Sequence, residues 1–263
     1  MGTKKLRAYS LLGNVALVNF NDNIKAQDKK KFAQKILRDN KSVKTVLEKV
    51  GKFKGRLRKI HTKVIAGEKT KEVLYRENGC SFRFNIDTTY FSPRLSNERK
   101  EIAGLIKKNE KVLVCFAGVA PFSIVIAKNS GANVVSNELN RIANKYARLN
   151  VELNKLKEKI EFVDGDFKKV AERLKKQKKK FDVIVMPRPQ LKDSFLEDCF
   201  KLVKKGTRIY YYDFCRIEDK HKIIEKIKLE AKKASKRIKI LNIKNAGEIA
   251  PYKVRLRVDF KVV

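Results

Sequence analysis

The sequence predicts an α/β fold with a mostly parallel sheet, preceded by a small α+β domain. From about Tyr90 onward, apolar runs typical of strands alternate with amphipathic runs typical of helices, and such alternation produces parallel sheets with right-handed crossovers. Two strand-like runs, residues 236–243 and 253–262, have no helix between them. They predict an antiparallel hairpin at the edge of the sheet.

Residues 1–88 are predicted to form the small α+β domain and to bind RNA. Its expected strands are Val15–Val18, Val73–Tyr75 and Phe82–Ile86, and its expected helix is Gln27–Leu37. The helix is predicted because Phe32, Ile36 and Leu37 recur at the spacing of a helical turn.

Residues 89–263 are predicted to form the larger domain. Its expected strands are residues 112–116, 133–136, 160–163, 182–186, 207–213, 236–243 and 253–262, and its expected helices are 122–129, 140–153, 167–177, 193–203 and 219–234. This order is the layout of class I methyltransferases, a Rossmann-like α/β fold.

The loop Phe116–Phe122 is the most informative stretch of the chain. It follows the apolar run Lys111–Cys115 directly and leads into a helical pattern. A tight turn from a strand into a helix leaves backbone N–H groups where a nucleotide-like ligand can lie. About twenty residues after Gly118, a second apolar run ends in Glu138, a carboxylate spaced to bind the two hydroxyls of a ribose.

The same loop argues against a dinucleotide. The third small residue of G-x-G-x-x-G is missing, because Phe122 or Ser123 stands at that place, and a Phe leaves little room for a pyrophosphate. An uncharged loop followed by a carboxylate suits S-adenosyl-L-methionine, a nucleoside that carries a cationic sulfonium and no phosphate. This is the predicted cofactor.

The charge of the chain predicts a polyanionic partner. Lys and Arg number 64 against 29 Asp and Glu, a formal charge of +35 over 263 residues, which favours nucleic acid. The basic stretch Gly51–Arg58 is a predicted contact, with a solvated basic loop as the other interpretation. We interpret the run Lys175–Lys180 as a solvated helix end or loop, with a phosphate contact as the alternative.

Several classes of protein and site are excluded. The start of the chain has no apolar segment of the signal-peptide kind, and no run approaches 18 apolar residues, so secretion and a membrane partner are not expected. The four cysteines form no C-x-x-C pair and there are two histidines, so no metal site is expected. The cytoplasm is the expected location.

Four motifs give the chain a family resemblance. They are Tyr90–Arg99, Phe116–Phe122, Asp164–Asp166 and Glu248–Tyr252. With them the chain, from about Gly13 to Val263, resembles the archaeal and eukaryotic tRNA (guanine-N1)-methyltransferases, which act on the guanosine 3′ of the anticodon. The opening Gly13–Val18 looks like the start of the family's second domain. The small N-terminal domain that contacts the outer corner of tRNA is therefore expected to be missing, and a monomer is expected.

The resemblance implies catalytic roles for three residues. Glu98 would be the general base on the guanine N1–H, unless it is only a helix-start carboxylate. Arg94 would stabilise negative charge on guanine O6, unless it binds phosphate or is structural. Tyr90 would shape the pocket near the sulfonium, with a core Tyr as the alternative.

The resemblance also implies binding roles. Arg58 would contact the flipped nucleotide or its phosphate. Glu138 would bind the ribose, Asp166 the adenine amino group, and Phe167 would form a stacking wall. The methionine part would be cradled by the loop residues Phe116, Ala117, Gly118, Val119 and Pro121.

Two departures from the family pattern affect the expected specificity. Ala120 stands where a Gly is usual, and one added methyl is expected to be tolerated. Pro187 stands where the family has the Asn of Asn-x-Pro, which helps to hold the target base. A pocket lined by Pro187 could suit a larger, flatter base, so the base acted on is left open.

Three alternatives to N1 methylation therefore remain. The first is carbon methylation of the tricyclic wyosine precursor, alone or as a second activity. The second is aminocarboxypropyl transfer to that precursor, against which Arg94 and Glu98 argue. The third is an RNA-binding protein without catalysis, against which Gly118, Glu138 and Asp166 argue together.

Overall fold

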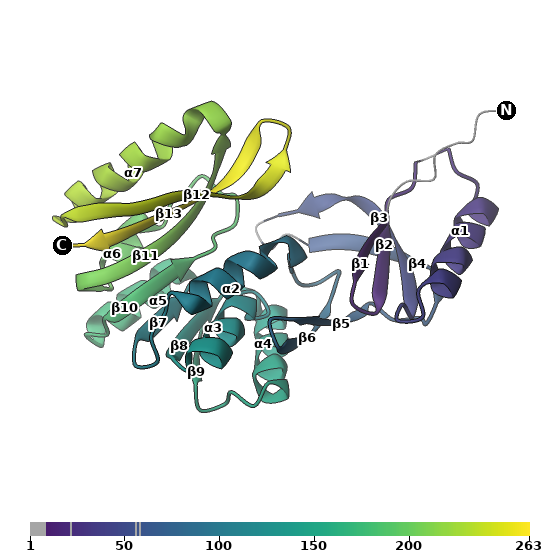
Figure 1. Cartoon of the computed structure of the whole chain (residues 1–263), viewed down its shortest axis with the longest axis horizontal. Coiled ribbons are helices and arrows are strands. Elements are labelled where there is room, and N and C mark those ends of the chain that lie inside the picture. The colour runs from purple at the N-terminus through teal and green to yellow at the C-terminus, as the bar shows by residue number, and fades with distance from the viewer. Residues whose placement is uncertain (1–8, 22, 56, 58) are drawn as a thin grey trace. The chain divides into compact units, whose positions relative to one another are not determined.

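The chain folds into two compact units, residues 1–93 and 94–263 (Figure 1). The computed structural model describes residues 9–21, 23–55, 57 and 59–263. Arg58, a predicted substrate contact, lies outside the described residues. The predicted α/β class is confirmed, with a smaller unit ahead of the mostly parallel sheet.

The first unit combines two small sheets with one helix. Its elements are β1 (Tyr9–Leu12), β2 (Val15–Val18), α1 (Ala26–Asp39), β3 (Thr45–Lys54), β4 (Lys59–Gly67), β5 (Glu72–Glu77) and β6 (Cys80–Asn85). One sheet has the order β1-β2-β3-β4 and the other pairs β5 with β6. Strands β2 and β3 are parallel, and α1 connects them with Ala33 and Ile36 buried against the sheet.

The second unit contains a seven-stranded sheet. Its elements are η1 (Pro93–Leu95), α2 (Ser96–Gly104), β7 (Lys111–Val114), α3 (Pro121–Ser130), β8 (Asn133–Glu138), α4 (Arg141–Leu153), β9 (Ile160–Asp164), α5 (Phe167–Lys176), β10 (Phe181–Met186), α6 (Leu196–Phe200), β11 (Val203–Arg216), η2 (Ile217–Asp219), α7 (Lys220–Lys233), β12 (Ile238–Ala250) and β13 (Lys253–Val262). The strand order is β12-β13-β11-β10-β7-β8-β9.

Strands β7 to β11 are mutually parallel, whereas β13 runs antiparallel to both β11 and β12. The predicted edge hairpin is thus confirmed, although its first strand, β12, continues to Ala250 and so extends beyond the predicted end at residue 243. The predicted helix at 193–203 is wrong in its bounds, because α6 spans only Leu196–Phe200 and β11 already begins at Val203. Phe195 ahead of α6 has a left-handed backbone with φ of 57°, which prevents an earlier helix start.

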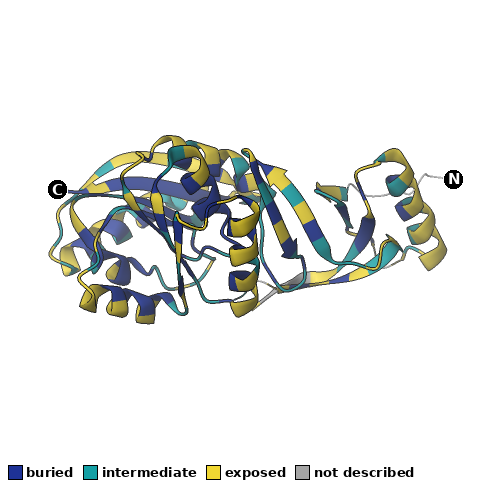
Figure 2. Cartoon of the chain, turned by 90° about the horizontal axis from the view of Figure 1, so that it is seen from below, coloured by how far each residue is buried: buried dark blue, intermediate teal, exposed yellow. Residues whose placement is uncertain are grey.

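The core of the second unit lies on the faces of the parallel strands, which helices cover. The helices are exposed (yellow) on one side and buried (dark blue) on the other (Figure 2). In β10 four consecutive residues, Val183–Met186, are fully buried, as expected for a strand covered on both faces. Strands β7 and β10 are neighbours although β8 and β9 lie between them in sequence. Ligands bind open α/β sheets at such a switch in strand order, beyond the carboxyl ends of the strands.

Candidate active site

The loop between β7 and α3 has an unusual backbone. Phe116, Gly118 and Ala120 all have left-handed conformations, with φ of 55°, 59° and 65°. This conformation costs a residue with a Cβ about 1–2 kcal/mol. The backbone at Ala120, where a Gly is usual, is therefore strained. Pro121, at the first position of α3, contributes no N–H donor, and Ala120, Val119 and Ala117 are buried.

Glu138 is held against this loop by two backbone donors. Its Oε2 accepts a hydrogen bond from Gly118 N–H at 2.8 Å, and its Oε1 accepts one from Asn140 N–H at 2.7 Å. Asn140 caps α4, so the carboxylate at the end of β8 is positioned by the loop on one side and by a helix start on the other. The structure therefore brings Gly118 and Glu138 together, and the binding of the ribose by Glu138 stays a prediction.

Two aromatic rings lie next to the loop. Phe116 packs edge-on to Phe167, with ring centroids 5.4 Å apart, and its centroid is 4.9 Å from that of Phe195. Phe167 is buried and begins α5, and Asp166 before it accepts a hydrogen bond from Lys168 N–H at 3.0 Å. Asp166 thus caps α5 in the structure, and its contact with an adenine amino group stays a prediction.

These residues fit S-adenosyl-L-methionine. The segment from Phe116 to Ser123 carries no Lys or Arg that could neutralise a pyrophosphate. Instead of a basic side chain, the site offers the fixed carboxylate of Glu138, which can accept hydrogen bonds from hydroxyl groups, and the partly buried ring of Phe116. This donor set suits a nucleoside that has a positive charge of its own.

The loop after β10 is organised by a buried arginine. Pro187 is half-buried, whereas Arg188 is buried and forms an ion pair with Asp213 of β11. Arg188 Nη1 also donates to the carbonyl oxygens of Pro189, Leu191 and Asp193 at 3.0–3.1 Å. Pro187 therefore stands in place of the usual Asn, and the next residue, Arg188, fixes the loop through these hydrogen bonds. Within the described residues, Arg188 Nε has no hydrogen-bond partner.

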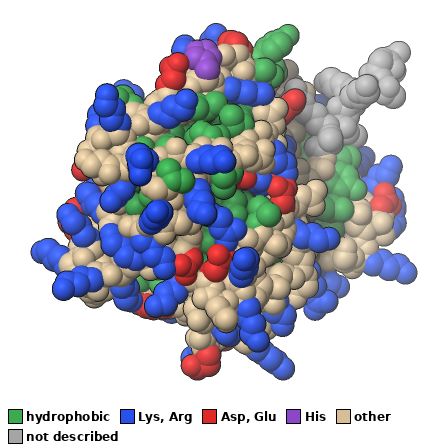
Figure 3. Space-filling model, turned by 60° about the vertical axis from the view of Figure 1, so that its left-hand side comes forward, with side chains coloured by type: hydrophobic (Ala, Val, Ile, Leu, Met, Phe, Trp, Pro, Cys, Tyr) green, Lys and Arg blue, Asp and Glu red, His purple; other side chains and the backbone are tan. Residues whose placement is uncertain are grey.

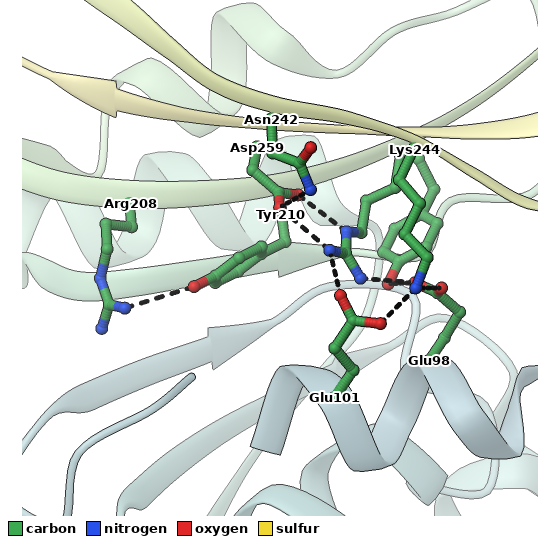
Figure 4. A network of polar contacts seen from close by, with 9 residues as sticks. Glu98, Glu101, Arg208, Tyr210, Asn242, Lys244 and Asp259 are labelled. Carbon is green, nitrogen blue, oxygen red and sulfur yellow. Dashed lines mark hydrogen bonds and ion pairs between the residues drawn. The ribbon is translucent and has the colours of Figure 1, made fainter. Parts of the chain in front are cut away.

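Glu98 lies in the first turn of α2, within a buried network of charges (Figure 4). Its Oε2 accepts hydrogen bonds from Tyr212 Oη at 3.0 Å and from Arg257 Nη1 at 2.8 Å. Its Oε1 is 3.0 Å from Lys244 Nζ. The carboxylate is thus more than a helix-start residue, because it is bonded to three strands, β11, β12 and β13.

Arg257 is the centre of this network. Its Nη2 donates to Glu101 Oε1 at 2.6 Å and its Nε donates to Asp259 Oδ1 at 2.8 Å. Burial by itself lowers the pKa of Arg257, but the hydrogen bond to Glu101 and the charge of Asp259 raise it above its ordinary value. Burial raises the pKa of Asp259, and Arg257 opposes this shift. The network holds three carboxylates against Arg257 and Lys244.

Tyr212 and Phe122 connect the network to the cofactor loop. The ring of Phe122, which ends the loop, lies 5.9 Å from the ring of Tyr212, and the guanidinium of Arg99 lies 5.7 Å from the Phe122 ring. Burial, and then the charge of Glu98, raises the pKa of Tyr212 well above its ordinary value, so its hydroxyl remains a donor. Glu98 is thereby linked, through the side chains of Tyr212 and Phe122, to the loop that is predicted to bind the cofactor.

The other two predicted catalytic residues lie outside the hydrogen-bond network of Glu98. Arg94 is exposed in the short helix η1, and Tyr90 is half-buried in the first unit. The contacts that the structure gives Glu98 involve neither of them. Their roles at the guanine and the sulfonium stay predictions.

Three members of the network were not predicted from the sequence: Arg257, Lys244 and Asp259. In β13, charged residues alternate with apolar ones, and such alternation ordinarily marks a strand with one solvent-facing side. Seven consecutive residues of β13 are nevertheless buried. One feature of the sequence could have indicated the ion pair. Arg257 stands two residues before Asp259, so the two opposite charges lie on the same face of their strand.

A lysine-lined groove of about 780 Å³ lies at the opposite, amino edge of the parallel strands. Its lysines are Lys111, Lys157, Lys159, Lys178, Lys179, Lys180 and Lys204. Lys and Arg side chains (blue) also outnumber acidic ones on the face drawn in Figure 3. Among the described residues there is no cluster of potential metal ligands and no helix long and apolar enough to span a membrane.

Two family models match the chain. One, described as the TRM5/TYW2 methyltransferase domain, matches residues 73–241, and the other, described as the TYW2 N-terminal domain, matches residues 3–70. Among curated relatives, the chain is 31% identical to the tRNA (guanine(37)-N(1))/4-demethylwyosine(37)-methyltransferase Taw22 of Nanoarchaeum equitans, over 97% of this chain and 100% of the relative.

Solved structures agree with these matches. The chain is similar to wild-type Trm5b from Pyrococcus abyssi, with a TM-score of 0.85 and 31% identity over 98% of this chain and 75% of that one. It is also similar to Methanocaldococcus jannaschii Trm5 in complex with adenosine, with a TM-score of 0.79 and 27% identity over 97% and 74% of the two chains.

Proposed function

The chain belongs to the TRM5/TYW2 methyltransferase family, and on that premise we propose that it transfers a methyl group from S-adenosyl-L-methionine to N1 of the guanosine 3′ of the anticodon in tRNA. The observation that carries this proposal is the buried Glu98 carboxylate, which the side chains of Tyr212 and Phe122 link to the loop that holds Glu138. We expect the enzyme to act as a monomer in the cytoplasm.

The chemistry requires a base on one side and a methyl donor on the other. Guanine N1–H is a weak acid, so a carboxylate that accepts its proton as the methyl arrives lowers the barrier. When bound, the cofactor supplies the methyl group. Gly118 and Glu138 would hold its nucleoside, as supported by the adenosine bound to the M. jannaschii relative. Glu98 would accept the proton.

A second candidate is methylation of a carbon of the tricyclic wyosine precursor. Pro187 favours it, because a proline in place of the usual Asn removes hydrogen-bond donors to a base edge and leaves a flat apolar surface. The name of the N. equitans relative includes both activities. The two reactions share the cofactor site and differ in the base that they accept.

Mass spectrometry of nucleosides distinguishes these candidates. Unmodified tRNA, and separately tRNA that carries the wyosine precursor, are incubated with the protein and methyl-labelled cofactor, then digested. We expect labelled 1-methylguanosine from the first substrate. Label that appears only in the tricyclic nucleoside would replace N1 methylation with the second candidate. If neither substrate becomes labelled, both proposals fail.

Gly118→Asp should abolish binding of S-adenosyl-L-methionine, because the added carboxylate would collide with the methionine part and repel its carboxylate. The left-handed backbone of Gly118 penalises any side chain, so Gly118→Ala is the matched control for strain. Calorimetric titration of both variants separates the two effects. If the Asp variant binds as well as the Ala variant, the loop is only a structural turn.

Binding of tRNA should weaken steeply with salt, as expected when several phosphates are neutralised. Charge reversal at Lys52, Lys54, Arg56 and Arg58 should weaken binding more than reversal at Lys178–Lys180 in the lysine-lined groove. Filter binding over a series of salt concentrations gives the affinity and the slope for both variants. Equal losses would contradict a specific RNA contact in the first basic stretch.

A further inference from the structure

The two oxygens of the Glu98 carboxylate are held by partners of different mobility. Oε2 is bonded to Tyr212 and Arg257, whose side chains are buried. In the described part of the chain, Oε1 has a single partner, the ammonium of Lys244 at 3.0 Å. The side chain of Lys244 is 39% exposed, against 1% for Arg257. One oxygen is therefore fixed, and the other is covered by a side chain that reaches solvent.

Lys244 has a second carboxylate available. Its Nζ also contacts Glu101 Oε2, and the Glu101 side chain is 37% exposed. The hydrogen bond to Glu101 raises the pKa of Lys244 against the lowering effect of burial, so the ammonium stays charged. Its flexible stem and three N–H donors allow it to keep Glu101 while it leaves Glu98.

We propose, on the basis of the proposed N1 methylation, that Lys244 is a positioning residue that covers Glu98 Oε1 until the guanine N1–H takes its place. Tyr212 and Arg257 keep Oε2 and so fix the plane of the carboxylate. The N1–H bond then breaks as an O–H bond forms at Oε1. The nitrogen electron pair forms the bond to the methyl carbon, the sulfonium leaves as a neutral thioether, and the proton later passes from Glu98 to water.

The charges around Glu98 decide the direction of each test. Tyr212 faces it from β11, Lys244 from β12, and Arg257 with Asp259 from β13; its own helix contributes Glu101 and Arg99. The helix α3, packed against α2, contributes Phe122 through the Arg99 contact, while its Lys128 is exposed. Of the two cations that contact the Glu98 carboxylate, Lys244 can be replaced without removing the hydrogen bonds of Arg257.

The first test measures binding without cofactor. The probes are one tRNA with guanosine and the same tRNA with 1-methylguanosine at the target position, because the second lacks the N1–H. Lys244→Met should increase the preference for guanosine by roughly fivefold, the size of one net hydrogen bond, since the ammonium no longer competes for Oε1. Lys239→Met, an exposed lysine on the same strand, should leave the preference unchanged. The steric effect of the N1 methyl group of the second probe is the same for both variants, so it cancels when their preferences are compared.

The second test measures the single-turnover rate against pH. Lys244→Met should move the acid limb to higher pH by roughly one unit, since an opposite charge at hydrogen-bond distance is lost. Glu101→Gln should move it to lower pH, because Lys244 then has Glu98 as its remaining carboxylate. The native protein must methylate guanosine; otherwise the proposed function itself fails. If it does so while Lys244→Met matches Lys239→Met in both tests, or Glu101→Gln shifts the limb upward, the role of Lys244 is overturned.

Discussion

Replacing Glu98 with Gln should slow single-turnover methyl transfer to guanosine by about 10²–10⁴-fold, the usual contribution of a positioned general base. Affinities for tRNA and cofactor should stay within a few-fold, because Gln has the shape of Glu and keeps a side-chain oxygen that accepts a hydrogen bond. The deficit should shrink as the pH rises, since guanine then loses its N1 proton without help. Quenched-flow assays with labelled cofactor over a pH series measure both effects.

Arg94→Ala is the comparison for this result. It should also slow the chemical step, but without recovery at high pH, because the missing charge stabilises the guanine anion rather than forming it. An undiminished rate in Glu98→Gln would remove the base assignment and leave the fold and the cofactor site unaffected. If the native protein methylates only the tricyclic precursor, guanosine gives no rate for either substitution to reduce.

Arg257→Met should cost about 3–5 kcal/mol of unfolding free energy, as expected when one partner of a buried ion pair is removed. The substitution keeps an unbranched side chain but leaves Glu98 and Asp259 buried without their shared cation. The loss should shrink as the pH falls, because protonation removes the buried charge of Asp259, whose pKa burial already raises. Urea unfolding of the full chain at pH 5 and pH 8 measures the change.

Arg141→Met is the matched control. Arg141 is exposed at the start of α4, so its replacement should change the unfolding free energy by no more than about 0.5 kcal/mol. A loss below about 1 kcal/mol in Arg257→Met would mean that the network contributes little to stability. A larger loss at pH 5 than at pH 8 would contradict the predicted sign of the pH effect.

Most of the second unit was predictable from the sequence. Its parallel strands are covered on both faces, so they are continuous apolar runs such as Val183–Met186 that pattern recognition finds readily. In contrast, β3 and β4 in the first unit were missed. Residues such as Glu48, Lys49 and Lys63 interrupt their apolar positions, and an amphipathic strand with many charges resembles a basic loop.

The candidate site was predictable only where it depends on neighbours in sequence. The Gly118–Glu138 contact follows from a strand, a turn and a second strand, a spacing visible in the sequence. The partners of Glu98 do not, because strand order decides which residues of β11, β12 and β13 face α2. Alternating charges in β13 carry no information about this burial until the position of the strand in the sheet is known.

The distances along the chain give the two halves of the site different folding requirements. Gly118 and Glu138 are 20 residues apart, whereas Glu98 is bonded to Tyr212 and Arg257, which are 114 and 159 residues away. Contacts between close residues form at a lower entropic cost and earlier than contacts between distant ones. The Gly118–Glu138 contact therefore needs only the closure of a 20-residue segment, whereas the Glu98 contacts need the completed order of the distant strands. Cofactor binding alone is thus no measure of a correctly completed sheet.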